Sequence, residues 1–284
     1  MREPRKGASA GTGKLKLLVT LLPLIVLFGL GGCSYLDGYA TSNYLKTVAQ
    51  IQYGSDSALL SLNSDLADLS AGPDKTKAAV TRLTGDKDNV DKTLSQLSAL
   101  EAPAEAQALK GHLLELYSEG SGLLGDLILT GNYRLKEEPL MSQYEGAASS
   151  FAAGAKSATD NKSLATCLTT YRDSVTSIDQ KAEQLETPTL SRRSNMRFVF
   201  DLKTLSEGLS GMIKALGSGN QDQIKAASNN LAAADGSSAS MKQQQQAEEA
   251  ADACDYNLMV RHLNRLMDQI GRDEAALHAQ FDRK

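Results

Sequence analysis

The sequence predicts an all-α protein, built as an antiparallel bundle of about eight helices. Residues that favour strands are scarce, because Trp is absent and only 5 of the 284 residues are Phe. Apolar residues recur at spacings of three and four, which is the period of a helix. Glycines and prolines stand where each of these apolar patterns stops. No run alternates for long enough to suggest a sheet.

The first two helices are predicted over residues 40–70 and 74–100. Leucines spaced 3-4-3 mark the first helix, which Gly72-Pro73 ends. The second has the same spacing, with Lys87 in one of its core positions. The two sets of core positions are Leu59, Leu62, Leu66, Leu69 and Val80, Leu83, Val90, Leu94, Leu97.

Two further helices are predicted over residues 104–130 and 137–157. Pro103 suits the first turn of a helix, where a missing backbone N–H costs nothing. Gly131-Asn132 has the composition of a helix stop, so we expect the chain to leave the helix there.

In the C-terminal half, the sequence predicts helices over residues 161–186, 189–216, 221–235 and 239–282. Breakers separate them, and Glu274 interrupts the last apolar stripe. Such narrow stripes are typical of helices that pack at small crossing angles. The breakers are Thr187-Pro188, Gly217 to Asn220 and Asp235-Gly236, and the stripes include Leu164, Leu168, Tyr171, Val175, Ile178, Leu202, Leu205, Leu209, Met212, Tyr256, Val260, Leu263, Met267 and Ile270.

Short repeated segments in the sequence suggest that the bundle is a duplicated helical hairpin. Leu100-Glu101-Ala102-Pro103 matches Leu185-Glu186-Thr187-Pro188, 85 residues later, and Gly131-Asn132 matches Gly219-Asn220, 88 residues later. A three-residue insertion just after Pro188 would reconcile the two offsets. The alternative is coincidence in a sequence rich in Ala, Leu and Ser.

The N-terminus has the pattern of an export signal. Residues 1–16 are basic, and an apolar run follows from Leu17 to Leu30. These 14 residues are too few for a bilayer span, which needs roughly 20, but suit the core of a signal peptide. The run ends in Leu30-Gly31-Gly32-Cys33.

This ending resembles the lipobox of bacterial lipoproteins. The resemblance implies cleavage between Gly32 and Cys33 and attachment of lipid to the Cys33 sulfur. We therefore expect a signal peptide at 1–32, a lipidated tether at 33–39, and a helical domain at 40–284 on the extracytoplasmic face of the membrane. In a two-membrane bacterium, Ser34 after the lipid site would favour the outer membrane. An uncleaved signal anchor is the alternative.

Charge argues against nucleic acid as a partner. Beyond residue 33 the chain has 25 basic and 33 acidic residues, a net charge of −8. An acidic surface repels phosphate backbones.

Two cysteines remain once Cys33 is assigned to lipid. Cys167 and Cys254 are candidates for a disulfide, since disulfides form outside the cytoplasm. The alternative is a pair of thiols that pack as small apolar groups.

No catalytic, metal or cofactor motif stands out. His112, Glu115 and Glu119 share one helical face, but three ligands on one helix need a fourth partner, and such glutamates ordinarily form a solvated face, so we expect no metal. Met259 and His262 lie one turn apart, which leaves a non-covalent haem open as an alternative. Signatures of zinc proteases, covalent haem, serine hydrolases and phosphate loops are missing, so we expect no enzyme and no cofactor.

The sequence therefore predicts a membrane-anchored extracytoplasmic lipoprotein that acts through contacts with an envelope protein. The alternative is a helical module of the envelope that binds a small molecule, a peptide or haem.

Overall fold

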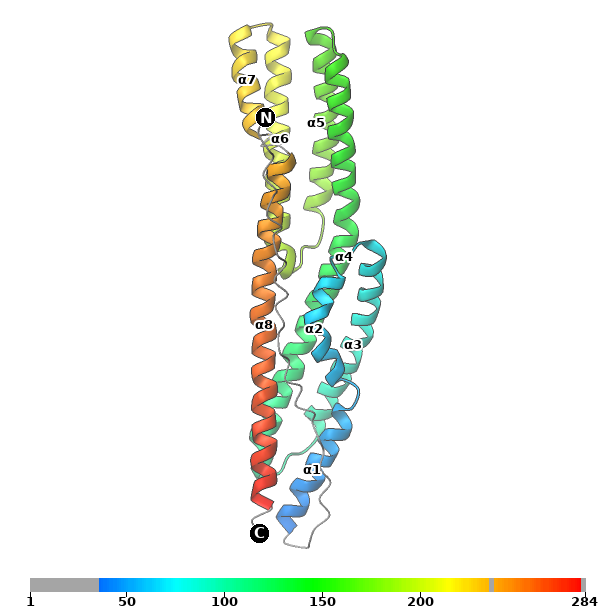
Figure 1. Cartoon of the computed structure of the whole chain (residues 1–284), viewed down its shortest axis with the longest axis vertical. Coiled ribbons are helices and arrows are strands. Elements are labelled where there is room, and N and C mark those ends of the chain that lie inside the picture. Colours follow the sequence, from blue (N-terminus) through cyan, green and yellow to red (C-terminus); the bar gives the residue numbers. More distant parts are fainter. Residues whose placement is uncertain (1–35, 235–237, 282–284) are drawn as a thin grey trace, which may run out of the picture. The chain divides into compact units, whose positions relative to one another are not determined.

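The protein is a bundle of helices, as the sequence predicts. The computed structural model describes residues 36–234 and 238–281, which form eight α-helices and two short 3₁₀ helices without any β-strand (Figure 1). The described residues belong to one compact unit. The α-helices are α1 (Leu36–Gln52), α2 (Asp56–Asp68), α3 (Pro73–Ala99), α4 (Gln107–Ser157), α5 (Asn161–Glu183), α6 (Arg192–Ser218), α7 (Gln221–Ala234) and α8 (Ser238–Phe281), and the 3₁₀ helices are η1 (Ala104–Ala106) and η2 (Thr189–Ser191).

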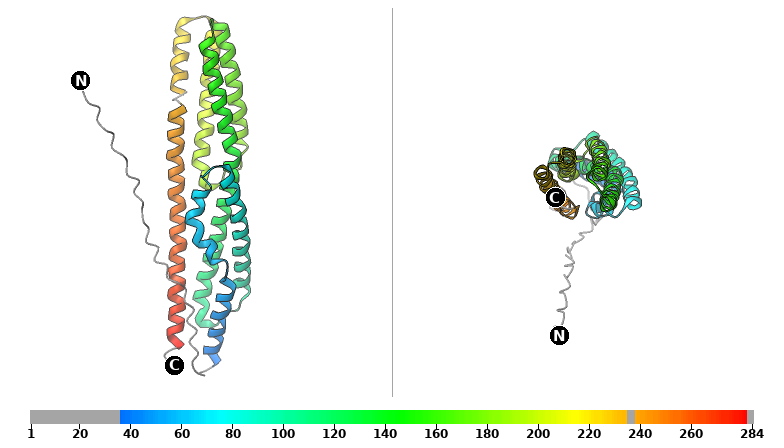
Figure 2. Two further views of the ribbon diagram at one scale, coloured as in Figure 1. Left: turned by 45° about the vertical axis from the view of Figure 1, so that its right-hand side comes forward. Right: turned by 90° about the horizontal axis from the view of Figure 1, so that it is seen from above.

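Two hairpins and a long final helix organise this unit. Helix α3 packs against α4, and α5 against α6, and α5 also contacts α4. Helix α7 folds back along α6, and α8 then runs beside α6 and α4 (Figures 1 and 2). The N-terminal half of α4 and the C-terminal half of α8 therefore lie side by side.

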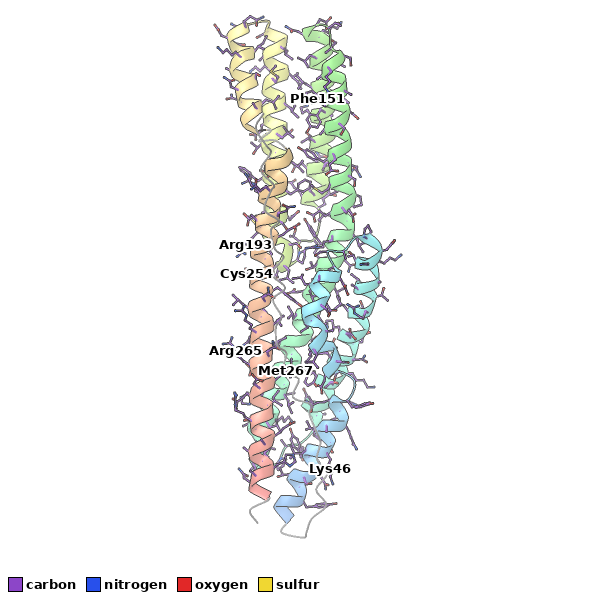
Figure 3. The ribbon with its side chains drawn as sticks, in the orientation of Figure 1. Lys46, Phe151, Arg193, Cys254, Arg265 and Met267 are labelled. Carbon is purple, nitrogen blue, oxygen red and sulfur yellow. The ribbon has the colours of Figure 1, made fainter. Side chains whose placement is uncertain are left out.

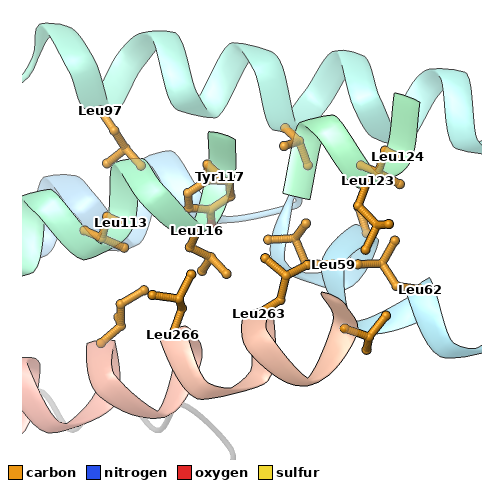
Figure 4. Close-up of a cluster of buried hydrophobic side chains, with 14 of the residues drawn as sticks. Leu59, Leu62, Leu97, Leu113, Leu116, Tyr117, Leu123, Leu124, Leu263 and Leu266 are labelled. Atoms are coloured by element: carbon orange, nitrogen blue, oxygen red, sulfur yellow. The ribbon is translucent and has the colours of Figure 1, made fainter. Parts of the chain in front are cut away.

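The buried apolar side chains form two separate cores. The first joins α1, α2, α3, the N-terminal half of α4 and the C-terminal half of α8. Its centre is a layer of leucines in which Leu59 and Leu62 of α2 face Leu263 of α8 (Figure 4). The second core joins the rest of α4 to α5, α6 and α7. Among the described helices, only α4 contributes a long apolar face to both cores.

Several helix ends follow the predicted local chemistry. Helix α3 begins at Pro73 after Gly72, whose φ of 100° is accessible to glycine. Helix α5 begins with a capping box, in which Ser163 N–H donates to Asp160 Oδ1 over 2.7 Å. Helix α6 ends at Gly219 in the left-handed region.

The prediction of a single helix over residues 40–70 is wrong. This segment divides into α1 and α2 at Gly54, which has a φ of 98°. Ser55 is buried in the turn and hydrogen-bonds Thr93 of α3 over 2.9 Å. The helix also begins earlier than predicted, at Leu36. The leucine spacing gave no sign of the break, because the four leucines that marked this helix, Leu59 to Leu69, all come after Gly54.

The predicted stop at Gly131-Asn132 is also wrong. The predicted helices at 104–130 and 137–157 are one helix of 51 residues, α4, which also contains Pro139. A Cβ at Gly131 would overlap Val80 Cγ2 and lie 2.8 Å from Leu69 Cδ2. Gly131 therefore provides a close approach between helices, and packing of α4 in both cores outweighs the local breaking signals.

The two proline corners have the same local structure. Pro103 and Pro188 both have extended backbones, with ψ of 160° and 159°, and a three-residue 3₁₀ helix follows each. Helices α4 and α6 then begin at Gln107 and Arg192, so the offset is still 85 residues at that point. The insertion expected just after Pro188 is therefore not there. Duplication remains a hypothesis, because α4 continues through the glycine that matches the end of α6.

Candidate functional site

The predicted lipidation and cleavage residues, Cys33 and Gly32, lie outside the described residues. Helix α1 begins at Leu36, so the segment between Cys33 and the first described helix is shorter than the predicted 33–39 tether. Among the helices that the structure describes, none is long and apolar enough to cross a membrane.

Cys167 and Cys254 are free thiols, and the predicted disulfide is not formed in this structure. Cys167 lies one turn before Tyr171 on α5, whose ring stacks on Phe151 at a centroid distance of 4.9 Å. Cys254 is exposed on α8 near Arg193 (Figure 3). Cys167 lies beside Gly154 of α4, whereas Cys254 stands between Asp252 and Asp255, which both pair with Arg193 of α6.

Helices α4 and α8 place two histidines beside carboxylates. His112 Nδ1 of α4 lies 2.6 Å from Asp273 Oδ2 of α8. His262 Nε2 of α8 lies 3.1 Å from Glu119 Oε2 of α4. In one pair α4 provides the histidine and α8 the carboxylate, and in the other pair the roles are exchanged. We call this line of contact the α4–α8 seam.

Near His112 the seam contains partly buried acids. Asp273 also accepts a hydrogen bond from Gln269 Nε2 over 2.8 Å. Burial raises the pKa of the neighbouring Glu274, and Asp56 and Asp273 raise it further by charge repulsion. Glu274 interrupts the predicted apolar stripe because it lies in this polar part of the seam.

One group in the seam has the donor types of a metal site. One ligand atom each of Glu115, Glu119 and His262 lie within 4.8 Å of one another. The sequence had grouped His112 with these two glutamates, but His112 pairs with Asp273 instead. Spacing along α4 could identify the glutamates, whereas the contribution of His262 depends on how α8 is placed.

A polar layer separates the two cores. Tyr133 of α4 donates its hydroxyl to Asn195 Oδ1 of α6 over 3.0 Å, and Asn195 Nδ2 donates to Thr187 Oγ1 over 2.8 Å. Burial raises the pKa of Glu137, one turn after Tyr133, while the Tyr133 hydroxyl partly offsets this. Glu249 of α8 raises the pKa further through its charge.

The same layer ties α8 to the start of α6. Ser191, at the N-cap of α6, makes no side-chain cap hydrogen bond. The buried Asp252 of α8 interacts with the backbone N–H of Ser194 instead, and its Oδ1 lies 3.6 Å from Arg193 Nη1. Burial raises the pKa of Asp252, and these contacts at the N-terminus of α6 offset part of that rise.

Replacing Glu137 by glutamine is expected to change how stability depends on pH. The pKa of Glu137 is higher in the folded state than in the unfolded state, so ionised Glu137 destabilises the fold. The wild-type protein therefore loses stability as the pH rises from the pKa of the unfolded state to that of the folded state. The stability of Glu137→Gln relative to wild type should therefore increase over that interval and stay constant above it. Urea unfolding between pH 4 and pH 8 measures this.

The matched control is Glu138→Gln, one residue away on the exposed face of α4. It should follow the wild-type pH profile. A Glu137→Gln profile parallel to that of Glu138→Gln would contradict the predicted role of burial.

A third feature is an exposed apolar and basic strip at the start of α6. Met196 and Phe200 lie one turn apart, and 63% and 59% of their surfaces are exposed. Arg192, one turn earlier, is exposed too, and Arg197 Cζ lies 5.6 Å from the centre of the Phe200 ring. We call Arg192, Met196 and Phe200 the α6 surface. Sequence reasoning missed it, although both apolar residues lie outside the core stripe of Leu202 and Leu205.

The outer side of the second core has a shallow groove between α4 and α5. Its volume is about 610 Å³, and Gln143, Thr170 and Asp173 are among its lining residues. Met259, which the sequence considered for haem, packs against the first core, and His262 pairs with Glu119. The chain matches no protein-family model, no curated protein and no solved structure.

Proposed function

We propose that this protein is a lipoprotein, held by lipid on Cys33 at the extracytoplasmic face of a bacterial membrane, whose bundle acts by binding an envelope protein. One observation carries the proposal: Leu30-Gly31-Gly32-Cys33 directly follows a basic segment and a 14-residue apolar run. Two or three acyl chains give stable anchoring, whereas one chain binds only marginally.

The early start of α1 supports a bundle that works close to the membrane. Only Ser34 and Tyr35 separate Cys33 from Leu36. A short tether restricts the distance between the bundle and the bilayer, in contrast to the long Gly/Ser linkers that let a domain move freely. The N-terminal end of α1 should therefore lie close to the bilayer.

The α6 surface supports binding of a protein. Methionine, aromatic residues and arginine are enriched in protein–protein interfaces. Phe200 and Met196 provide apolar area, and Arg192 adds a charge beside them. We propose a partner that offers an apolar pocket with acidic residues at its rim.

Replacing Cys33 by alanine tests the anchor. The variant should accumulate as unprocessed precursor, because the acyl acceptor is gone, and it should incorporate no fatty acid. Metabolic labelling with an alkyne palmitate, followed by gel analysis, measures both. Cys254→Ala is the matched control and should label like the wild type. Equal labelling of Cys33→Ala and wild type would contradict the proposal.

Photo-crosslinking in intact cells tests the contact. A photoreactive phenylalanine at position 200 should give one main crosslinked product with an envelope protein, and Met196→Asp should abolish that product. The same photoreactive residue at Glu207, exposed on α6 two turns beyond Phe200, is the control and should not yield it. Identical products from both positions, or none from position 200, would count against the α6 surface.

A further inference from the structure

We infer that Glu115, Glu119 and His262 form a binding site for a divalent transition-metal ion, with Zn²⁺ as the best-matched cation. The site goes beyond the proposed function, since neither the lipid anchor nor the α6 surface requires it. Its ligands come from two helices, α4 and α8, that are more than 140 positions apart in the chain.

The geometry brings three suitable donor atoms together. The ligand atoms lie within 4.8 Å of one another, and His262 Nε2 is already 3.1 Å from Glu119 Oε2. Tetrahedral zinc with bonds of about 2.1 Å requires ligand atoms roughly 3.4 Å apart. Glu115 and Glu119 are exposed and His262 half-buried, so rotation of their side chains can close the difference without moving either helix.

The charges favour a cation at this place. Glu115 and Glu119 are one turn apart on α4, an arrangement in which like charges repel. His262 pairs with Glu119, while Glu115 has neither a hydrogen bond nor an ion pair within the described ranges. A bound dication would remove the repulsion and give Glu115 a partner.

The other histidine of the seam provides a contrast. His112 faces one carboxylate, Asp273, whose second oxygen already accepts from Gln269. The His112 pair is therefore complete without an ion. Its position between the same two helices makes it a matched control for the proposed site.

The surroundings leave room for water ligands. Gly111 lies one turn before Glu115, and Gly122 lies one turn after Glu119. A Cβ at either glycine would meet no atom within 4 Å. Three protein ligands beside open space match a zinc site that keeps a position for water.

The donor set selects among cations. Imidazole with carboxylates suits Zn²⁺, Cu²⁺ and Ni²⁺, whereas Ca²⁺ and Mg²⁺ prefer oxygen ligands alone. An ion held by both helices would also link α4 to α8. Binding should therefore stabilise the folded protein in proportion to ion concentration.

The test is calorimetric titration of ZnCl₂ into the full-length protein, purified without a histidine tag and freed of metal by a chelator. The background carries Cys33→Ser, Cys167→Ser and Cys254→Ser, so that thiols cannot supply the signal. We expect one Zn²⁺ per chain and no comparable signal with MgCl₂. At zinc concentrations about 100-fold above Kd, the melting temperature should rise by about 5 °C.

Variants assign the site. His262→Ala and Glu115→Gln should each weaken zinc binding at least tenfold, while His112→Ala should leave Kd within about twofold of the background. Circular dichroism confirms that each variant is folded, which is expected because these side chains are not in either core. Absence of stoichiometric binding, or equal Kd values for His262→Ala and the background, would overturn the inference. So would a tenfold loss in His112→Ala.

Discussion

Replacing Tyr256 by alanine is expected to lower the free energy of unfolding by about 3–5 kcal/mol, the usual cost of truncating a buried aromatic side chain. Tyr256 of α8 is fully buried in the first core, and its hydroxyl donates to the backbone carbonyl of Leu62 in α2. This hydrogen bond spans 194 positions of the sequence. The variant therefore measures how firmly α8 is held against the N-terminal helices, and urea unfolding gives the value.

Two variants separate the contributions at this position. Tyr256→Phe keeps the ring and should lose only about 1 kcal/mol, the net value of a typical hydrogen bond. Leu258→Ala, two residues away with 54% of its surface exposed, should change stability by less than about 1 kcal/mol. If Tyr256→Ala cost no more than Leu258→Ala, the packing of α8 described above would be wrong.

Gly131→Ala is expected to destabilise the protein, although alanine favours helices over glycine by up to about 1 kcal/mol. The added methyl would overlap Val80 Cγ2, and a β-branched side chain in a helix has little freedom to move. Overpacking of this kind costs about 1–3 kcal/mol, so the net loss should be about 1–2 kcal/mol. Thermal and urea unfolding measure it.

Gly122→Ala, on the exposed side of the same helix, is the control. A Cβ there meets nothing within 4 Å, so only the gain in helix propensity remains, up to about 1 kcal/mol of added stability. The two substitutions should thus have opposite signs. Stabilisation by both would show that α3 and α4 do not approach closely at Gly131.

The elements that could be predicted from sequence are those decided by local chemistry. Gly72-Pro73, Asn220 and the two proline corners mark helix boundaries within a few residues, because backbone conformation there depends on the residue itself. The apolar spacing also identified most of the core. Lys87, predicted in a core position, is half-buried and pairs with Asp91 over 2.6 Å, with its stem along Gly125.

The errors arise where packing overrides local preference. Gly131 and Pro139 do not end α4, because the helix contributes to both cores on either side of them. Conversely, α1 ends at Gln52, just before Gly54, and the leucines that predicted one helix over residues 40–70 lie only in the part after this glycine. A single sequence gives no measure of how strongly neighbouring helices hold such positions.

The candidate site was predictable only in part. The sequence placed Glu115 and Glu119 on one face of a helix, yet it could not identify His262 as their neighbour, since that depends on the register of α8 against α4. The residues of the α6 surface could have been identified from the sequence, because Met196 and Phe200 do not follow the spacing of the core residues. Whether these residues form an exposed contact surface or a second core face could be decided only from the packing of the helices in the structure.

Intact-mass measurement of the protein isolated from its native membrane tests the lipoprotein assignment most directly. It should give a polypeptide that begins at Cys33, with the added mass of a diacylglycerol on sulfur, with or without a further acyl chain on the new N-terminus. A chain that retains residues 1–32, or one that begins at Cys33 without any lipid, would contradict the assignment.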